Sequence, residues 1–220
     1  MHHIVQQLID GVILTGDVFT DVRTLIMKWG LSYTLEHCMR VSRQAHQLAA
    51  RFSVNTDEAQ IAGLIHDISD IVPGSEMMPL AEAFSLEILP EERYFPPILH
   101  QRLSAEMARE IFQIDNRSIL SAIGCHTTLK KGASPLDKVV FLADKIEWDQ
   151  PSTAPLRDAI LVALDESLDA AALCYLDYLW KNRRDLAVIH PWMQEARNEL
   201  LAMDKENSSG LTGLKKGLND

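Results

Sequence analysis

The sequence predicts an all-α protein, a single bundle of roughly ten helices. Apolar residues recur at intervals of three and four in successive segments, which is the spacing of one helix face. No segment of useful length alternates apolar and polar residues as a strand would. Capping residues and prolines separate the apolar segments, so each segment has a predicted beginning and end.

The composition fits a globular protein and limits its partners. The 220 residues suffice for one large domain, and 47% of them are hydrophobic. The formal net charge is −10, whereas a protein that binds nucleic acid normally has a basic surface. The charge therefore argues against nucleic acid and leaves room for a small phosphorylated ligand.

Cysteine usage and the apolar runs predict a cytoplasmic location. Cys38, Cys125 and Cys174 follow neither a zinc spacing nor a disulfide framework, which favours a reducing compartment. Asp10 and Asp17 interrupt the first apolar stretch and no cationic region precedes it, so we expect no signal peptide. No apolar run approaches the ~20 residues that span a bilayer, so no membrane partner is expected.

The N-terminal part of the chain predicts an extension and two long helices. Residues 1–30 read as a helical extension of one or two helices. The next helix, 32–52, has an apolar stripe with His37 at its rim. A capping-box sequence starts a helix at about 55 that carries His66-Asp67 and ends before Pro73.

The middle and C-terminal parts predict further helices of ordinary length. An amphipathic helix is expected within 75–89, followed by a loop bracketed by Pro90, Pro96 and Pro97. The remaining expected helices are 98–108, 116–125, 135–146, 165–184 and 191–201. We expect residues 31–205 to form the main domain and the polar segment 206–220 to be a disordered tail.

The pair His66-Asp67 is the first candidate for chemistry. It lies in an apolar helical segment, where a buried imidazole and carboxylate are costly unless something neutralises them. A hydrogen bond between the two side chains would do so, and for an isolated pair it is the common solution. A divalent metal ion would also do so, because His nitrogen and Asp oxygen are ordinary ligands of first-row metals.

Further polar residues share this position in or beside apolar helix faces. They are His37, His100, His126, Thr127 and Asp144. Taken singly, each also fits a hydrogen-bonded core residue. Together with His66-Asp67 they form a nitrogen and oxygen set that suits iron, manganese or zinc.

The order of these residues resembles the HD-domain metal-dependent phosphohydrolase superfamily. Within it, the chain looks like the YqeK-type symmetrical bis(5′-nucleosyl)-tetraphosphate hydrolases over about residues 32–200. The stretches that carry the resemblance are Ala62–Ser69, His126–Thr128, Phe141–Glu147 and Ile189–Asn198. The resemblance implies a helical HD domain that cleaves diadenosine tetraphosphate into two ADP molecules.

The resemblance also implies a metal site. Iron would be the metal, and manganese or zinc also suit the ligand set. If a second ion binds, His100 and His126 are its predicted ligands, although the resemblance itself places these two histidines beside the nucleotide diphosphate. The ligands of the first ion would be His37, His66, Asp67 and Asp144.

The remaining site residues take roles around the phosphates by the same resemblance. His100, His126 and Asp67 would be catalytic, the two histidines by donating hydrogen bonds to phosphoryl oxygens or carrying a proton. Thr127 and His190 match family positions at the nucleotide pocket and are predicted contacts. Arg102 is a third predicted phosphate contact, a cation gained where the family has a small Gly-Pro and this chain has Gln101-Arg102. Lys130 and Lys131 fit either a phosphate contact or a solvated loop.

Three positions depart from the family pattern where its members usually have cations. They are Thr34, Asp70 and Gln150. The metal ligands are thus retained while the phosphate contacts are altered, which predicts weak hydrolysis of dinucleoside tetraphosphates.

Two other functions remain compatible with the sequence. A nucleotide or metal sensor would keep the pocket without turnover, and a di-iron oxygenase would use the six nitrogen and oxygen ligands for two ions. A homodimer is also compatible with the sequence. Phosphate release, metal stoichiometry and an oxygen-dependent spectrum separate these functions.

Overall fold

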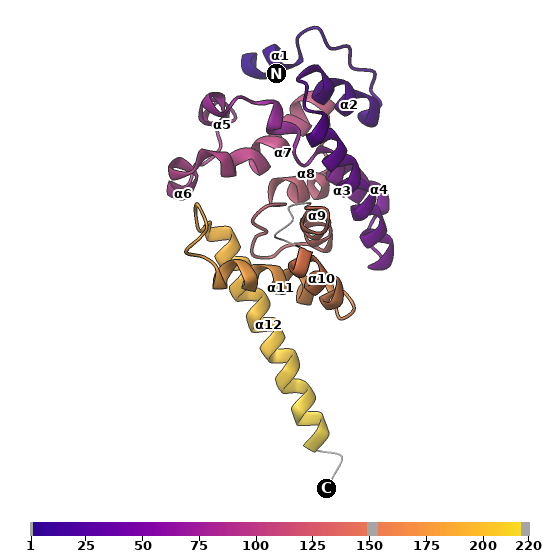
Figure 1. Ribbon diagram of the computed structural model, residues 1–220, viewed down its shortest axis with the longest axis vertical. Helices are drawn as coiled ribbons and strands as arrows, with labels where there is room; N and C mark the ends of the chain where they lie inside the picture. The colour runs from indigo at the N-terminus through magenta and orange to yellow at the C-terminus, as the bar shows by residue number, and fades with distance from the viewer. Residues whose placement is uncertain (1, 149–153, 217–220) are drawn as a thin grey trace.

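The computed structural model describes residues 2–148 and 154–216, and within these ranges its regular elements are all helical. The helices pack as a bundle from which the last one projects (Figure 1). This confirms the predicted all-α class, with twelve α-helices in the described ranges against roughly ten expected. No helix of this described part has the length and apolar character needed to cross a membrane.

The N-terminal segment forms two helices, α1 (His3–Ile9) and α2 (Val18–Lys28), at one end of the bundle (Figure 1). Helix α2 buries Val22, Leu25 and Ile26 and packs against α3 and α4. The two predicted helices are therefore present and joined to the core. Their assignment as a separate extension stays a prediction.

Helices α3 (Ser32–Arg51) and α4 (Thr56–Ile65) form a close antiparallel pair. Gly63 permits the approach, since a Cβ built there would lie 3.0 Å from the Cα atom of Ser42 and 3.1 Å from the carbonyl oxygen of Val41. The Ser42 hydroxyl also donates to the carbonyl of Gln60 at 2.8 Å. Backbone contact therefore sets the spacing of these two helices.

Helix α4 ends earlier than the sequence predicts. Ile65 is its last residue, His66 is its C-cap, and Asp67 precedes the 3₁₀ helices η1 (Ile68–Ile71) and η2 (Gly74–Glu76). The prediction of one helix continuing to Val72 is therefore wrong. Apolar periodicity persists through η1, so the pattern alone does not reveal the change of helix type.

The next segment contains α5 (Met77–Ala83), α6 (Pro90–Tyr94), η3 (Pro96–Leu99) and α7 (His100–Phe112). The sequence predicts a loop between the prolines, and this prediction is wrong. Both α6 and η3 begin with proline, which suits the first helical turn because its N–H has no intrahelical partner there. The two short helices place His100 at the start of α7.

Helix α8 (Arg117–Gly124) leads into α9 (Pro135–Ile146), the central helix of the bundle. Helix α9 packs against α3, α4, α8 and α11 (Leu168–Lys181), so Asp144 and Lys145 are buried with its apolar residues. Ser134 caps α9, accepting from the Asp137 N–H at 3.1 Å, as its position before Pro135 predicts.

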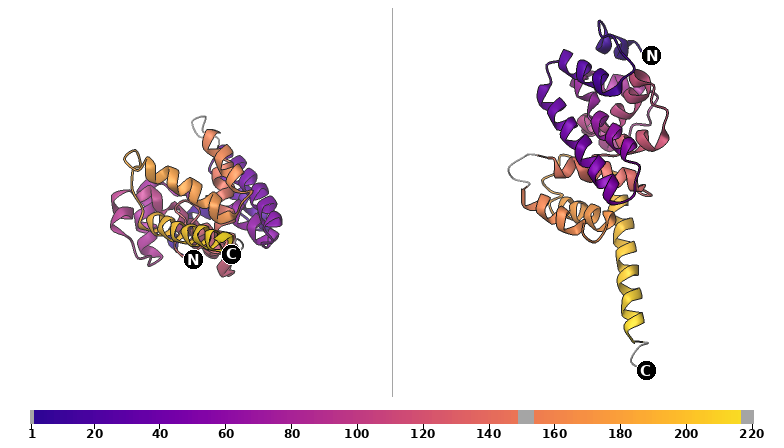
Figure 2. Two further views of the ribbon diagram at one scale, coloured as in Figure 1. Left: turned by 90° about the horizontal axis from the view of Figure 1, so that it is seen from below. Right: turned by 90° about the vertical axis from the view of Figure 1, so that its right-hand side faces the viewer.

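The C-terminal part contains α10 (Ala154–Ala163), α11 and α12 (Pro191–Lys216). Helix α10 was not predicted, whereas α11 lies within the predicted helix 165–184. Helix α12 leaves the bundle and continues to Lys216, so the predicted disordered tail is helical as far as that residue (Figure 2). Once a helix has started, each further residue adds a hydrogen bond without a new nucleation cost, which lets a polar segment extend it.

Candidate metal and phosphate site

A cavity of about 410 Å³ lies where α3, the turn after α4, α7, the end of α8, α9 and α11 meet. Its wall combines histidines, carboxylates, hydroxyls, aromatic rings and one lysine. The lining residues are Tyr33, Thr34, His37, Asp67, Asp70, His100, His126, Thr127, Asp144, Lys145, Trp148 and Tyr175. This volume is within the usual range of small-molecule sites.

The four predicted metal ligands come from different local settings, and His37, Asp67 and Asp144 line the cavity while His66 lies behind its wall. His37 projects from α3, His66 and Asp67 follow the last turn of α4, and Asp144 lies near the end of α9. His37, His66 and Asp144 are buried, and the side chain of Asp67 is 16% exposed. The close packing of α3, α4 and α9 therefore brings these four side chains together.

The four side chains approach one another at distances that one metal ion could bridge. His37 Nε2 lies 3.2 Å from Asp144 Oδ1, and His66 Nε2 lies 3.1 Å from Asp67 Oδ2. His66 Nε2 is also 3.8 Å from Asp144 Oδ1, and His37 Nε2 is 3.9 Å from Asp67 Oδ2. All four predicted ligands of the first metal therefore face one point.

Four buried atoms of this cluster make no hydrogen bond despite these approaches. They are His37 Nε2, His66 Nε2, Asp67 Oδ1 and Asp144 Oδ1. An unpaired buried polar atom is costly, and the atoms of His37, His66 and Asp144 lie close enough together to need a common partner, whereas Asp67 Oδ1 faces His100 and His126. Two imidazole nitrogens and two carboxylate oxygens fit a first-row metal ion.

Three histidines are fixed in the same tautomer by the backbone. The Nδ1 atoms of His66, His100 and His126 each lie 2.8 Å from a carbonyl oxygen three residues earlier, at Gly63, Pro97 and Ile123. A carbonyl oxygen only accepts, so each Nδ1 carries the hydrogen. In the neutral ring Nε2 is then a lone-pair atom that faces the cavity, which is the usual orientation of metal-bound histidine.

A second group of ligands adjoins the first. His126 Nε2 lies 3.2 Å and His100 Nε2 3.7 Å from Asp67 Oδ1, and the two imidazole nitrogens are 3.1 Å apart. The Thr127 hydroxyl lies 2.9 Å from His100 Nε2 and donates to it. Asp67 therefore lies between two pairs of histidines. Its Oδ2 atom faces His37 and His66, and its Oδ1 atom faces His100 and His126.

The electrostatics of the cluster favour charged carboxylates. Burial opposes ionisation of Asp67, but His66 and His126 outweigh it and hold its pKa well below the usual range. Burial also opposes the imidazolium of His66, yet the Asp67 carboxylate raises its pKa well above 6.5. Burial lowers the pKa of His126 to about 4, so this ring is neutral at neutral pH.

Lys145 belongs to the site, although the sequence reasoning gave it no role. Its Nζ atom donates to Asp144 Oδ2 at 2.5 Å, and its side chain is 5% exposed. Burial opposes the charge of each partner, but their mutual attraction lowers the pKa of Asp144 and raises the pKa of Lys145. The available signal was the charged pair Asp144-Lys145 at the end of the apolar run 139–146.

Asp70 reaches the cavity by a different route from the one predicted. It lies in η1, whereas the sequence predicts that the helix carrying His66-Asp67 continues through this position to Pro73. Thr34 donates to its Oδ2 atom at 3.1 Å, and both residues line the cavity. Burial and the Asp67 carboxylate raise the pKa of Asp70. Gln150, the third departure, lies outside the described residues.

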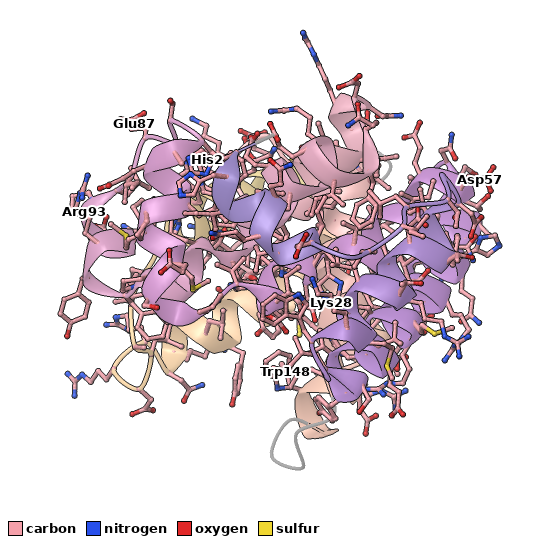
Figure 3. All side chains as sticks on the ribbon, turned by 90° about the horizontal axis from the view of Figure 1, so that it is seen from above. His2, Lys28, Asp57, Glu87, Arg93 and Trp148 are labelled. Carbon is pink, nitrogen blue, oxygen red and sulfur yellow. The ribbon has the colours of Figure 1, made fainter. Side chains whose placement is uncertain are left out.

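Arg102 and His190, predicted as phosphate contacts, lie in a separate buried cluster. Arg102 Nη1 donates to both oxygens of Glu92, at 2.7 and 2.9 Å, and to the carbonyl of Glu87 at 2.7 Å. His190 Nε2 is 3.4 Å from the same carboxylate. Figure 3 places Glu87 and Trp148 on different flanks, so this cluster and the rim of the cavity are distinct.

The two lysines of the loop after α8 are also directed elsewhere. Lys130 donates to the Ser121 hydroxyl at 2.6 Å and lies 3.8 Å from Asp137. Lys131 lines a shallow surface depression on α12 with Glu195 and Glu199. Neither lysine is among the residues that line the cavity.

A helical bundle whose histidines and aspartates converge on one cavity defines a class of metal-binding helical proteins. The HD domain family matches residues 34–149, which include all six histidine and aspartate ligands of the two groups. The chain belongs to the HD domain family and is an HD-type phosphohydrolase.

Curated relatives extend the similarity beyond that domain. An uncharacterized protein in the pepC 5′ region of Lactococcus lactis subsp. cremoris is 47% identical over 147 residues, 67% of this chain and 74% of that protein. A symmetrical bis(5′-nucleosyl)-tetraphosphatase of Bacillus subtilis is 30% identical over 165 residues, 71% of this chain and 87% of that enzyme.

A longer relative and a solved structure complete the comparison. A probable nicotinate-nucleotide adenylyltransferase/Ap4A hydrolase of Mycoplasma genitalium is 32% identical, and the match covers 66% of this chain but 41% of that protein. A predicted HD superfamily hydrolase involved in NAD metabolism from Clostridium acetobutylicum superposes with a TM-score of 0.77 at 29% identity. That match covers 87% of this chain and 99% of the other.

Proposed function

We propose that the protein hydrolyses a phosphoanhydride bond in a nucleotide or dinucleoside polyphosphate, with diadenosine tetraphosphate plus water giving two ADP as the leading reaction. The observation that carries the proposal is the set of four unpartnered buried atoms on His37, His66, Asp67 and Asp144. The printed activity of the Bacillus subtilis relative supports the choice of substrate.

The four residues of that set would hold the metal ion. Iron is the proposed metal, and manganese and zinc fit the same nitrogen and oxygen ligands. When bound, such an ion lowers the pKa of its water toward ~7 and draws charge from a phosphoryl oxygen. Asp67 and Asp144 supply the anionic ligands, and the backbone carbonyl of Gly63 orients His66 through its Nδ1 hydrogen.

Of the two roles expected for His100 and His126 from the sequence, we propose ligation of a second ion rather than donation to the phosphate. Because the Nδ1 hydrogen of each is bound to a backbone carbonyl, their neutral rings offer a lone pair at Nε2 and no hydrogen there. Both face Asp67 Oδ1, so we assign His100, His126 and Asp67 as ligands of a second ion. The Thr127 hydroxyl, which donates to the same His100 Nε2 atom at 2.9 Å, would have to release this bond when His100 binds the ion, and Thr127 borders the space for a phosphate.

The same second group supports an alternative function. Two iron ions held by His37, His66, Asp67, His100, His126 and Asp144 would also suit a di-iron oxygenase. This alternative requires oxygen consumption and a visible spectrum that changes with oxygen. Phosphohydrolysis requires neither.

The test uses purified full-length protein loaded in turn with Fe²⁺, Mn²⁺ and Zn²⁺. Diadenosine tetraphosphate, ATP, ADP and a simple phosphomonoester are supplied, and products are separated by chromatography. We expect ADP as the sole nucleotide product of diadenosine tetraphosphate, with ¹⁸O from labelled water in one ADP. Binding without turnover of any nucleotide by each loaded form would instead identify a sensor.

A further inference from the structure

The cavity has an unusual charge balance for a site that accepts phosphates. Three carboxylates line it, Asp67, Asp70 and Asp144, and Lys145 is the one lysine or arginine among its lining residues in the described ranges. Phosphate sites normally rely on several cations or on backbone N–H groups. Any anion that enters therefore depends on bound metal and on this one ammonium group.

The surroundings of Lys145 leave part of its hydrogen-bonding capacity unused. An ammonium group has three donors, and the bond to Asp144 Oδ2 uses one of them. The other neighbours are the rings of Phe141, Trp148 and Tyr175, whose centroids lie 5.6, 5.9 and 5.7 Å from Nζ. Aromatic faces attract a cation but accept no conventional hydrogen bond.

The burial of the Lys145 side chain indicates that its charge has a specific role. The Lys145 side chain is 5% exposed, and a pocket of three rings would accommodate an apolar side chain of the same length. The bond to Asp144 Oδ2 accounts for one of the three ammonium donors, and the other oxygen of that carboxylate faces the histidine cluster. Trp148 is exposed at the edge of the bundle (Figure 3), and it lines the cavity together with Lys145 and Tyr175.

We propose that Lys145 is a substrate-binding residue that donates to an anionic oxygen of the ligand and thereby selects phosphorylated ligands over neutral ones. This rests on the proposed function of the cavity. Its aromatic walls hold the ammonium group in place, and Asp144 keeps it within reach of an anion next to the metal ligands. The ligand class is a nucleoside diphosphate moiety, whose neutral counterpart is the nucleoside.

The test compares Lys145→Met with wild type, both as metal-loaded full-length protein. Methionine keeps an unbranched side chain in the aromatic pocket and removes the charge. Metal content per chain is measured by elemental analysis, and the affinities for ADP, pyrophosphate and adenosine are measured by calorimetry. We expect ADP and pyrophosphate to bind about ten- to a hundredfold more weakly, the range of a charge-assisted hydrogen bond. Adenosine affinity and metal content should not change.

Two further variants make the comparison specific. Lys145→Arg keeps the charge and should retain ADP affinity within a few-fold. Lys138→Met is the matched control, because Lys138 lies on the same helix, pairs with Asp169 and does not line the cavity. It should leave all three affinities unchanged.

The outcomes separate the inference from the proposed function. Unchanged ADP affinity in Lys145→Met overturns the inference, and a parallel loss of metal and ADP shows that Lys145 only positions Asp144. Wild-type protein that binds metal but neither ADP nor pyrophosphate overturns the proposed function and this inference with it. If Lys145→Met does not fold, the wild-type protein is tested by NMR instead. The ¹⁵Nζ resonance of Lys145 should then shift when pyrophosphate is added and not when adenosine is added. A resonance that does not shift with pyrophosphate overturns the inference.

Discussion

The Nε2 atoms of His100 and His126 lie 3.1 Å apart, and in their neutral rings neither nitrogen carries the hydrogen, because each Nδ1 donates to a backbone carbonyl. Two lone pairs at this distance repel unless a cation or a proton lies between them. Burial holds the pKa of His126 to about 4, which disfavours the proton at neutral pH. The pair is therefore suited to a second metal ion beside Asp67 Oδ1.

Replacing His126 with Ala should remove this second ion and leave the first. Elemental analysis of iron-loaded protein should give close to two ions per chain in wild type and about one in the variant. His46→Ala is the control, because His46 is an exposed histidine of α3. A single ion in wild type, retained in His126→Ala, would contradict the two-ion assignment.

Replacing Asp144 with Ala should lower metal content several-fold, because the change removes a buried anionic ligand. Asp137→Ala is a matched control on the same helix. It removes a buried carboxylate that bonds Ser121 and the Ser134 N–H, and should cost about 1–3 kcal/mol of unfolding free energy without loss of metal. Equal metal loss in both variants would mean that damage to α9, and not ligation, is responsible.

Asp70→Lys should increase the hydrolysis of diadenosine tetraphosphate at low salt. Two unit charges ~5 Å apart at an effective dielectric of ~20 repel by about 3 kcal/mol. Asp70 lines the cavity wall, which partly desolvates its carboxylate, but the residue still has enough exposed surface to be screened by salt. We therefore expect a rise of about three- to tenfold in kcat/KM that fades with added salt. Asp57→Lys makes the same charge change on an exposed residue outside the cavity and should have little effect. A slower Asp70→Lys enzyme would identify Asp70 as a productive part of the site.

Glu92→Gln should destabilise the fold and leave the metal bound. Glu92 is fully buried between Arg102 and His190, and removing one member of a buried pair typically costs about 3–5 kcal/mol. Glu106→Gln, which removes the partner of Arg109 in a more exposed pair on α7, should cost well under 1 kcal/mol by urea unfolding. A similar loss in both variants would contradict the buried-pair argument.

The same carboxylate predicts a pH dependence. Burial opposes its ionisation, but His190, the Leu89 N–H and Arg102 lower the pKa of Glu92 in the folded protein. A lowered folded pKa stabilises the protein above the unfolded pKa of about 4.3, and this contribution is lost as the pH falls through the folded pKa. Wild type should therefore lose its stability advantage over Glu92→Gln below about pH 4. A constant difference down to pH 2 would show that the charge of Glu92 is not the cause.

The sequence predicted those features that depend on local pattern. Apolar periodicity and caps located the main helices, and the cap at Ser134 is present as expected. Each histidine and aspartate could be identified from the sequence because it is a polar residue at an apolar helix face. Their meeting in one cavity agrees with the prediction, which rested on their order in the chain.

Other features depended on partners that are distant in the sequence. Arg102 was assigned to phosphate because Glu92, which binds it, gives no signal of burial in the sequence. Lys145 was passed over because part of its aromatic pocket, Tyr175, comes from α11. The tautomers of His100 and His126 depend on backbone carbonyls, which sequence reasoning did not place.

The contact at Gly63 has a consequence for the choice of metal. Because the backbones of α3 and α4 touch there, the separation of His37 from His66 follows from two rigid helices and not from adjustable side chains. A preorganised ligand pair discriminates by ionic radius, since an ion of the wrong size cannot draw the helices together. Gly63 would thus help to determine which metal ion the histidines and aspartates select.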